Sequence, residues 1–301
     1  MRIGFGVPVS GSWATPDNMI RIARRAEELG YHSLWTFQRL LFPAGHAMAP
    51  VYRSVTDPIV TLSYLAGVTS TIRLGVAVLN MPFFSPALLA KQLATLQIVS
   101  RGRLDVGLGL GWMPEEFAAS GVPIEHRGRR AEEYITVLRT LWSPGIAEHG
   151  GEFYQVPPSH SDPKPGPPPS IIMGGTAEPA LRRAGRLADG WVSSSRVDLT
   201  AIQQQIYIVK EAAREAGRDP DALRIIVRGV TRPGKPGASD RKPLSGSYEE
   251  IRRDLAVLEE HGVTEVFHDL NFNPEAGSPD ADAVEAMRLA EEALEALRPD
   301  S

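Results

Sequence analysis

Eight short runs of β-branched and other apolar residues alternate along the chain with longer segments that have helical periodicity. The runs cover residues 2–8, 33–37, 72–79, 104–108, 171–173, 191–193, 223–228 and 265–268. Strands separated by helices of about ten or more residues must pair in parallel, because a tight turn cannot reach a parallel partner. Eight such units predict an α/β fold, a (β/α)₈ TIM barrel that forms a single domain over residues 1–301.

The helical segments carry start and stop signals. Thr15 is a typical N-cap, Pro16 suits the first helical position, and Gly30 follows the last residue of the apolar stripe. Ser247 and Glu250 have the spacing of a capping box. We interpret the apolar stripes as packing surfaces only.

Two stretches rich in Pro or Gly interrupt the alternation, residues 149–170 and 232–246. Both are predicted to be loops or insertions. The second follows the seventh strand, on the C-terminal face where barrel active sites lie. We expect this insertion loop to be a flap over the substrate, the alternative being an idle surface loop.

Composition excludes several classes of function. A net charge of −4 with scattered basic residues argues against nucleic acid or an acidic membrane as a partner. The absence of cysteine excludes disulfides, thiolate metal sites and cysteine nucleophiles, and the histidines form no ligand cluster, so no metal site is expected. The first residues read as a strand and no apolar run has membrane-spanning length, which favours a cytoplasmic protein.

Common catalytic motifs are also missing. The sequence has no phosphate-binding Gly-Lys-Ser/Thr loop, no His-Glu-x-x-His and no Gly-x-Ser-x-Gly. Gly107, Gly109 and Gly111 do not fit the dinucleotide-binding fingerprint, because its third glycine would fall on Trp112. Catalysis by a nucleophile of the protein is therefore not indicated.

Two clusters at strand ends are candidates for binding a ligand. The segment 109–112 lets a flat ring approach the backbone closely, or its glycines only relieve crowding in the barrel. Gly174, Gly175 and Thr176 stand between a strand and a helix, where free N–H groups suit a phosphate, although a plain tight turn has the same residues. The run 193–196 adds hydroxyls and a positive charge beside them, or is a solvated turn.

Four segments together resemble one family. They read "EELGYHSLW", "DPIVTLSYLAGVTSTIRLGVAVLNMP", "SRGRLDVGLGLGWMPEEF" and "IIMGGTAEPALRRAGRLADGWV". In this order they resemble the luciferase-like monooxygenase superfamily over nearly the whole chain. Within it, the chain is most similar to the branch that uses the deazaflavin coenzyme F420.

The resemblance implies a cofactor site at the strand ends. It implies a bulge with a non-proline cis peptide at Ala77–Val78 that supports one face of a ring. The cofactor would be coenzyme F420, with FMN as the alternative, and a small organic molecule would be the substrate. The residues that the resemblance places around the cofactor are Ala77, Val78, Asn80, Gly109, Leu110, Gly111, Trp112 and nearby Glu115 for the ring, and Gly174, Gly175, Thr176, Ser194 and Ser195 for the phosphate.

One departure concerns the acid/base group. Where many relatives have Asp-His after the second strand, this chain has Gln38 and Arg39, and neither accepts a proton at neutral pH. Arg39 either holds an anionic group or polarises a carbonyl of the substrate, or it is a surface or interface arginine. His268, at the end of the eighth strand near Arg228 and Asp269, is the acid/base candidate, with a structural role as the alternative.

Three functions follow from these observations. The first is a deazaflavin-dependent oxidoreductase that moves a hydride between the cofactor and a small organic substrate. The second is an FMN-dependent monooxygenase of the bacterial luciferase type. The third is a flavin-binding barrel without turnover, which the Gln38–Arg39 departure leaves open. The resemblance also implies a homodimer.

Overall fold

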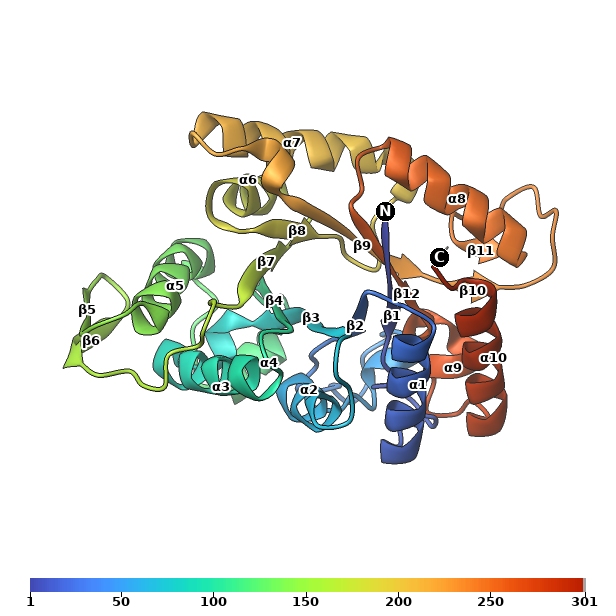
Figure 1. Ribbon diagram of the computed structural model, residues 1–301, viewed down its shortest axis with the longest axis horizontal. Helices are drawn as coiled ribbons and strands as arrows, with labels where there is room; N and C mark the ends of the chain where they lie inside the picture. The colour runs from blue at the N-terminus through green and yellow to red at the C-terminus, as the bar shows by residue number, and fades with distance from the viewer. Residues whose placement is uncertain (300–301) are drawn as a thin grey trace.

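The structure, a computed structural model, describes residues 1–299 and is a closed barrel of eight parallel strands surrounded by helices (Figure 1). Around the barrel the strands follow the order β1-β12-β9-β8-β7-β4-β3-β2. The barrel strands are β1 Arg2–Gly6, β2 Ser33–Thr36, β3 Arg73–Asn80, β4 Leu104–Gly109, β7 Ser170–Gly174, β8 Gly190–Val192, β9 Arg224–Val230 and β12 Glu265–Asp269. Each coincides with one of the eight apolar runs, so the predicted α/β barrel is confirmed.

Helices alternate with these strands, as the periodicity predicts. They are α1 Pro16–Glu28, α2 Pro58–Ala66, α3 Pro86–Val99, α4 Pro114–Ala119, α5 Arg127–Trp142, α6 Glu178–Leu187, α7 Ile202–Glu215, α8 Tyr248–Glu260, α9 Pro274–Gly277 and α10 Ala283–Ala296. The Thr15 hydroxyl accepts from Asn18 N at 3.3 Å, and Ser247 and Glu250 form the reciprocal capping box. Within residues 1–299, none of the helices combines the length and apolarity that crossing a membrane requires.

Side chains fill the inside of the barrel. The Trp35 ring stacks on the Phe267 ring with centroids 5.1 Å apart, and Ile172, Val192 and Ile226 pack with them. A larger apolar core lies between the strands and the helices. The interior is therefore a packed layer rather than a pore, and a ligand must bind above it, at one end of the strands.

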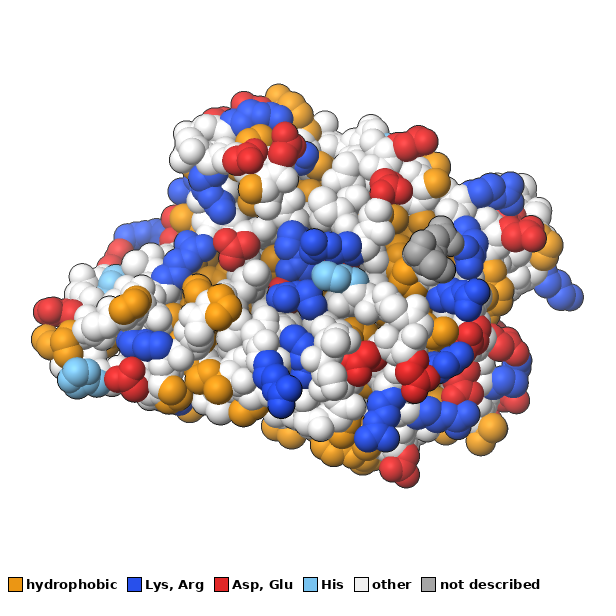
Figure 2. Space-filling view, viewed as in Figure 1, with side chains coloured by type: hydrophobic (Ala, Val, Ile, Leu, Met, Phe, Trp, Pro, Cys, Tyr) orange, Lys and Arg blue, Asp and Glu red, His pale blue; other side chains and the backbone are white. Residues whose placement is uncertain are grey.

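Charged groups close the end of the barrel where the strands begin. The buried Asp105 carboxylate accepts hydrogen bonds from Arg73 at 2.6 and 2.8 Å and from Arg224 at 2.6 and 3.1 Å. Arg224 also reaches the buried Glu265 carboxylate at 2.8 Å. On the face that carries the N-terminus, Lys and Arg side chains gather near the middle (Figure 2). The buried network of Arg73, Asp105, Arg224 and Glu265 joins the starts of four strands, β3, β4, β9 and β12.

The Pro-rich stretch 149–170 is more ordered than the predicted loop. Strands β5 Ala147–Gly150 and β6 Gln155–Ser159 form an antiparallel hairpin that projects beside α5 (Figure 1). The Glu133 carboxylate of α5 accepts from the N–H groups of Phe153 and Tyr154, at 3.0 and 2.7 Å, and so fixes the turn of the hairpin. The stretch is thus an insertion with a hairpin of its own, whose strands were not predicted. It lies between α5 and β7, before a barrel strand, and so not at the C-terminal face.

Candidate active site

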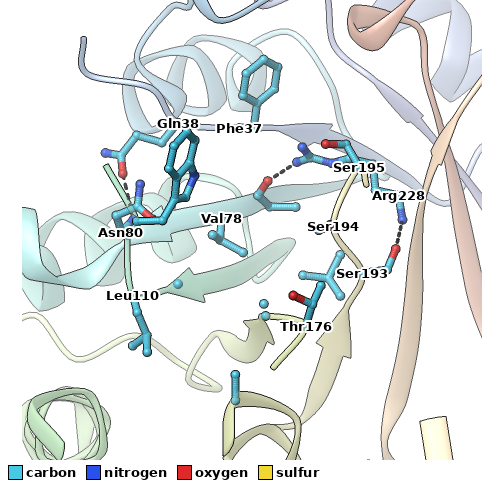
Figure 3. A pocket seen from close by; sticks show the side chains of 18 of the residues that line it. Phe37, Gln38, Val78, Asn80, Leu110, Thr176, Ser193, Ser194, Ser195 and Arg228 are labelled. Atoms are coloured by element: carbon cyan, nitrogen blue, oxygen red, sulfur yellow. Dashed lines mark hydrogen bonds between the residues drawn. The ribbon is translucent and has the colours of Figure 1, made fainter. Parts of the chain in front are cut away.

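A cavity of about 450 Å³ opens at the ends of the strands where β2, β3, β4, β7, β8 and β9 terminate. Most of the residues that the sequence predicts at the site line this cavity. They are Gln38, Arg39, Ala77, Val78, Asn80, Gly109, Leu110, Gly111, Trp112, Gly174, Gly175, Thr176, Ser194 and Ser195. Figure 3 shows several of them converging on one space from strands far apart in the sequence.

The floor of the cavity is an irregular part of β3. The register between β3 and β4 shifts between Val76 and Leu79, and the Ala77–Val78 peptide is cis, as the resemblance implies. The Arg228 guanidinium, from β9, donates a hydrogen bond to the Ala77 carbonyl (Figure 3). The floor is therefore tied to the opposite wall of the barrel.

Two glycines make room for the Val78 side chain. A Cβ added at Gly109 would lie 2.4 Å from Val78 Cγ2, and one added at Gly174 would lie 2.9 Å from Val78 Cγ1. Both distances are too short for a real side chain. Val78 is therefore wedged between β4 and β7, where it offers an apolar bed for a flat ring.

The start of α6 forms the polar corner of the cavity. Gly174, Gly175, Thr176 and Ala177 line it, and no side chain caps the helix start at Ala177. The serines of the run 193–195 and the guanidinium-bearing Arg127 and Arg196 line the same cavity. Free N–H groups at a helix start, with hydroxyls and guanidinium groups, suit a phosphate.

The residue pair after β2 is embedded in contacts with the protein. Gln38 Oε1 accepts from Asn80 N at 2.8 Å, while the buried Gln38 Nε2 has no hydrogen-bond partner among residues 1–299. Arg39 Nη1 lies 2.9 Å from Glu116 Oε2, and the Arg39 guanidinium lies over the Trp112 ring at 4.9 Å. Arg39 is thus a buried, charge-compensated lining residue, and Gln38 keeps one free donor.

His268 and Glu115 are not among the residues that line the cavity. His268 is fully buried, its Nδ1 lies 2.9 Å from Thr231 Oγ1, and burial lowers the pKa of His268 to about 3. Its neighbour Phe267 faces the barrel interior, so alternation along β12 turns His268 toward the helices. Glu115 Oε1 instead lies 3.1 Å from His46 Nε2. The structure therefore places the proposed acid/base residue away from the ligand space.

The segment 232–246 does not cover the cavity. None of its residues lines it. Leu244 is fully buried, and Arg241 binds the Asp254 carboxylate of α8 at 2.8 Å. The segment contains the short pair β10 Arg232–Pro233 and β11 Ser245–Gly246. The prediction of a substrate flap is therefore wrong, because this insertion packs against α8 instead of lining the cavity.

Arg228 and Asp269 are a buried pair beneath the cavity. Arg228 Nε lies 3.5 Å from Asp269 Oδ2, and both side chains are almost fully buried. Burial lowers the pKa of the Arg228 guanidinium and raises the pKa of the Asp269 carboxyl, because each charge loses contact with water. Arg228 lines the cavity and keeps its positive charge close to any ligand there.

Three contributors had no clear signal in the sequence. Tyr52 and Arg127 line the cavity from segments with no motif, and Glu116 holds Arg39 as well as the N–H groups of Leu40 and Leu41, at 2.7 and 3.4 Å. Glu115 and Glu116 are neighbours in the first turn of the short helix α4. Helical periodicity over so few residues does not show which of the two faces inward.

The cavity fits a flat tricyclic cofactor with a phosphate. The Val78 bed offers an apolar surface, the unpartnered Gln38 Nε2 offers a donor for a ring carbonyl or nitrogen, and the α6 corner suits the phosphate. Among residues 1–299, no three acidic or histidine side chains come close enough together to hold a metal ion.

Comparison with known proteins identifies the family. Residues 3–235 match the luciferase-like monooxygenases. An uncharacterised protein of Mycobacterium tuberculosis is 34% identical over 283 residues, which span 89% of this chain and 90% of that protein. The FMNH₂-dependent dimethylsulfone monooxygenase of Pseudomonas putida is 33% identical over 211 residues, 68% of this chain and 56% of that enzyme.

A solved structure has the same fold. The F420-dependent secondary alcohol dehydrogenase, in complex with an F420–acetone adduct, superposes with a TM-score of 0.79 at 18% identity and covers 99% of each chain. The sequence match over residues 3–235, rather than this fold likeness, decides the family. The chain belongs to the luciferase-like monooxygenase family, a group of oxidoreductases that work with flavin or deazaflavin cofactors.

Proposed function

We propose that this oxidoreductase uses the deazaflavin coenzyme F420 to transfer a hydride to or from a small organic substrate. The observation that carries the proposal is the charge of the cavity wall. No Asp, Glu, His or Lys lines the cavity within residues 1–299, whereas four arginines do: Arg39, Arg127, Arg196 and Arg228. Glu116 compensates Arg39 and Asp269 lies 3.5 Å from Arg228, whereas no carboxylate of residues 1–299 pairs with Arg127 or Arg196. These two charges favour a cofactor with several negative charges.

The side chain of coenzyme F420 is more acidic than that of FMN. FMN ends at its phosphate, whereas the F420 side chain continues beyond the phosphate into carboxylates. The start of α6 and the serines 193–195 suffice for a phosphate. Arg196 lines the same cavity, with its guanidinium 5.7 Å from the Trp112 ring centroid, and we propose that it meets a carboxylate of the longer F420 side chain. This additional cation supports F420 over FMN.

The residues of the chain bind and orient rather than react. When bound, the deazaflavin supplies the hydride at its C5 position, so the protein needs no nucleophile. Val78 supports the ring, Gln38 Nε2 donates to its polar edge, and the α6 corner holds the phosphate. Trp112, which is 50% exposed, lies at the mouth and limits the entry of water. Fixing two reactants side by side supplies much of the rate enhancement in such chemistry.

Turnover separates the candidate functions. With reduced F420 under anaerobic conditions, we expect the purified protein to oxidise the cofactor when it meets an acceptor from a panel of aldehydes, ketones and activated alkenes. With FMNH₂, we expect no dioxygen uptake above that of the free flavin. Rapid dioxygen uptake with FMNH₂ would favour a monooxygenase, as the dimethylsulfone relative is named. Cofactor binding without exchange across the panel would favour a non-catalytic barrel.

The Arg196→Ala variant tests cofactor choice. We expect its affinity for F420 to fall by about tenfold or more, because a hydrogen bond to a charged group contributes about 1.5–3 kcal/mol. Its affinity for FMN should stay unchanged. Arg182→Ala is the matched control, since Arg182 lies on α6 but pairs with Glu215 at the surface. Equal losses for F420 and FMN would show that Arg196 serves the phosphate, and the argument for F420 would fail.

We also propose that two copies of the chain pair through α2 and α3, which lie side by side (Figure 1). Exposed apolar side chains on these helices include Val60, Leu88 and Val99, and hydrophobic side chains line the edge of the molecule over them (Figure 2). We expect light scattering after gel filtration to give a dimer, and Val99→Glu to give a monomer. Val284→Glu, on exposed α10, is the control. A monomeric parent protein would contradict the proposal.

A further inference from the structure

Tyr52 is held rigidly at the edge of the cavity. It ends a single helical turn, Pro50–Tyr52, in the long segment between β2 and α2. Its ring meets Phe37 and Phe272 edge to face, with centroids 6.4 and 5.7 Å apart, and the Arg39 guanidinium lies 4.7 Å from its centroid. Contacts on several sides of one ring fix the direction of its hydroxyl group.

The hydroxyl of Tyr52 is free to bind a ligand. Tyr52 lines the cavity, yet the structure gives its Oη no hydrogen-bond partner within residues 1–299. The two tyrosines that are buried bind the protein instead: the Tyr31 hydroxyl donates to the Leu294 carbonyl at 2.9 Å, and that of Tyr134 to the Phe84 carbonyl at 3.3 Å. Tyr52 is the tyrosine that lines the cavity within the described residues, and its hydroxyl is available there to a ligand.

A positive charge lies beside Tyr52. The Arg228 guanidinium contacts the same two phenylalanines as Tyr52 does, at 5.4 Å from the Phe37 centroid and 5.1 Å from the Phe272 centroid. Arg228 also lines the cavity. In contrast to Arg39, which Glu116 neutralises at 2.9 Å, Arg228 has its carboxylate partner Asp269 only at 3.5 Å. A substrate oxygen between the phenol and this guanidinium would be stabilised as negative charge develops on it.

Among the lining side chains of residues 1–299, Tyr52 is also the one suited to proton exchange. The other ionisable lining residues of the described chain are the four arginines, which stay charged. The amides and aliphatic hydroxyls around them do not titrate near neutral pH. A phenol is a stronger acid than an alcohol, so it gives its proton to an alkoxide and recovers one from water. The missing Asp-His pair of relatives thus has a substitute in the same β2–α2 segment.

We infer that Tyr52 is the catalytic residue that exchanges a proton with the substrate oxygen, and that the substrate is a small carbonyl compound or the corresponding alcohol. The inference rests on the proposed hydride transfer. In the direction of reduction, a C–H bond forms at the carbonyl carbon with the electron pair that arrives as hydride from the reduced deazaflavin. The carbon–oxygen π bond breaks, and its pair takes the proton from Tyr52 Oη. Two electrons pass from cofactor to substrate, and water returns the proton to Tyr52.

The Tyr52→Phe variant tests this role, because it removes the hydroxyl and keeps the ring. Tyr207→Phe, on the exposed surface of α7, is the matched control. The probes are acetone and cyclohexanone labelled with carbon-13 at the carbonyl, at saturating concentration. Infrared difference spectra of the bound probe, with and without oxidised F420, report hydrogen bonding to its oxygen. A parallel F420 titration by fluorescence quenching shows whether the cofactor site is intact.

We expect a bound carbonyl band at lower wavenumber in the parent protein and in Tyr207→Phe. In Tyr52→Phe the shift should disappear while F420 affinity stays the same. Where a ketone turns over, single-turnover oxidation of reduced F420 should slow by about 100-fold and lose its dependence on pH. A band that is equal in the parent and Tyr52→Phe, or no bound ketone in the parent, overturns the inference. A Tyr52-dependent band without F420 binding would instead refute the proposed function alone.

Discussion

Replacing Gly109 with alanine is expected to weaken cofactor binding by about 100-fold and leave the barrel folded. The new Cβ would lie 2.4 Å from Val78 Cγ2. Val78 has little room to move toward β7, because its Cγ1 already lies 2.9 Å from the place that a Cβ of residue 174 would take. The Val78 side chain must then move into the cavity, where the ring would lie. Overpacking of this kind costs about 1–3 kcal/mol, and a ring displaced from its bed loses affinity by about 100-fold.

The control for Gly109→Ala is Gly234→Ala. A Cβ at Gly234 meets nothing within 4 Å, and the backbone there has no positive φ. Fluorescence titration of F420 measures affinity for both variants, and circular dichroism during heating measures whether each is folded. Parent-like affinity in a folded Gly109→Ala protein would show that the ring does not lie on Val78.

Asp105→Asn is expected to cause the largest loss of stability. The Asp105 carboxylate is fully buried and pairs with both Arg73 and Arg224 at 2.6 Å. Removing its charge leaves Arg73 without a carboxylate partner and Arg224 with Glu265 alone, and breaking a buried ion network in this way costs about 3–5 kcal/mol. Urea unfolding at neutral pH measures this loss. Asp221→Asn, which breaks the exposed pair with Lys210, should leave the stability close to that of the parent, because water screens exposed ion pairs. Equal small losses in both variants would contradict the account of the network.

The same network predicts the dependence of stability on acid. Burial alone would raise the pKa of Asp105, but the hydrogen bonds from Arg73 and the charge of Arg224 hold it below its ordinary value. The stabilisation is therefore complete above the pKa of an unfolded aspartate, about 3.9, and is lost as the pH falls through the lower folded value. The asparagine variant should accordingly lose less stability than the parent as the pH falls below about 4.

The barrel could be predicted because its signals are local. Strand runs, N-caps such as Thr15 and the capping box at Ser247 and Glu250 act over a few residues, and the structure contains them all. The hairpin in 147–159 was missed because its prolines are unusual in strands. Proline is tolerated there since β5 and β6 pair only with each other.

The site was less accessible to prediction, since it depends on tertiary contacts. Gly109 and Gly174 could be predicted at the site because each lies at the end of a strand, where a ligand can come close to the backbone. Both line the cavity. For Tyr52 there was no signal, because a long irregular segment carries it to the barrel mouth. His268 could have been placed better, because alternation from the inward-facing Phe267 turns it away from the ligand.

The most direct test of the central claim is a titration of the purified protein with coenzyme F420 and, separately, with FMN, followed by quenching of protein fluorescence. The exposed Trp112 at the cavity mouth should report occupancy. We predict saturable, tight quenching by F420 and much weaker quenching by FMN. Preference for FMN would contradict the deazaflavin assignment, and saturable binding of neither would contradict the cofactor site itself.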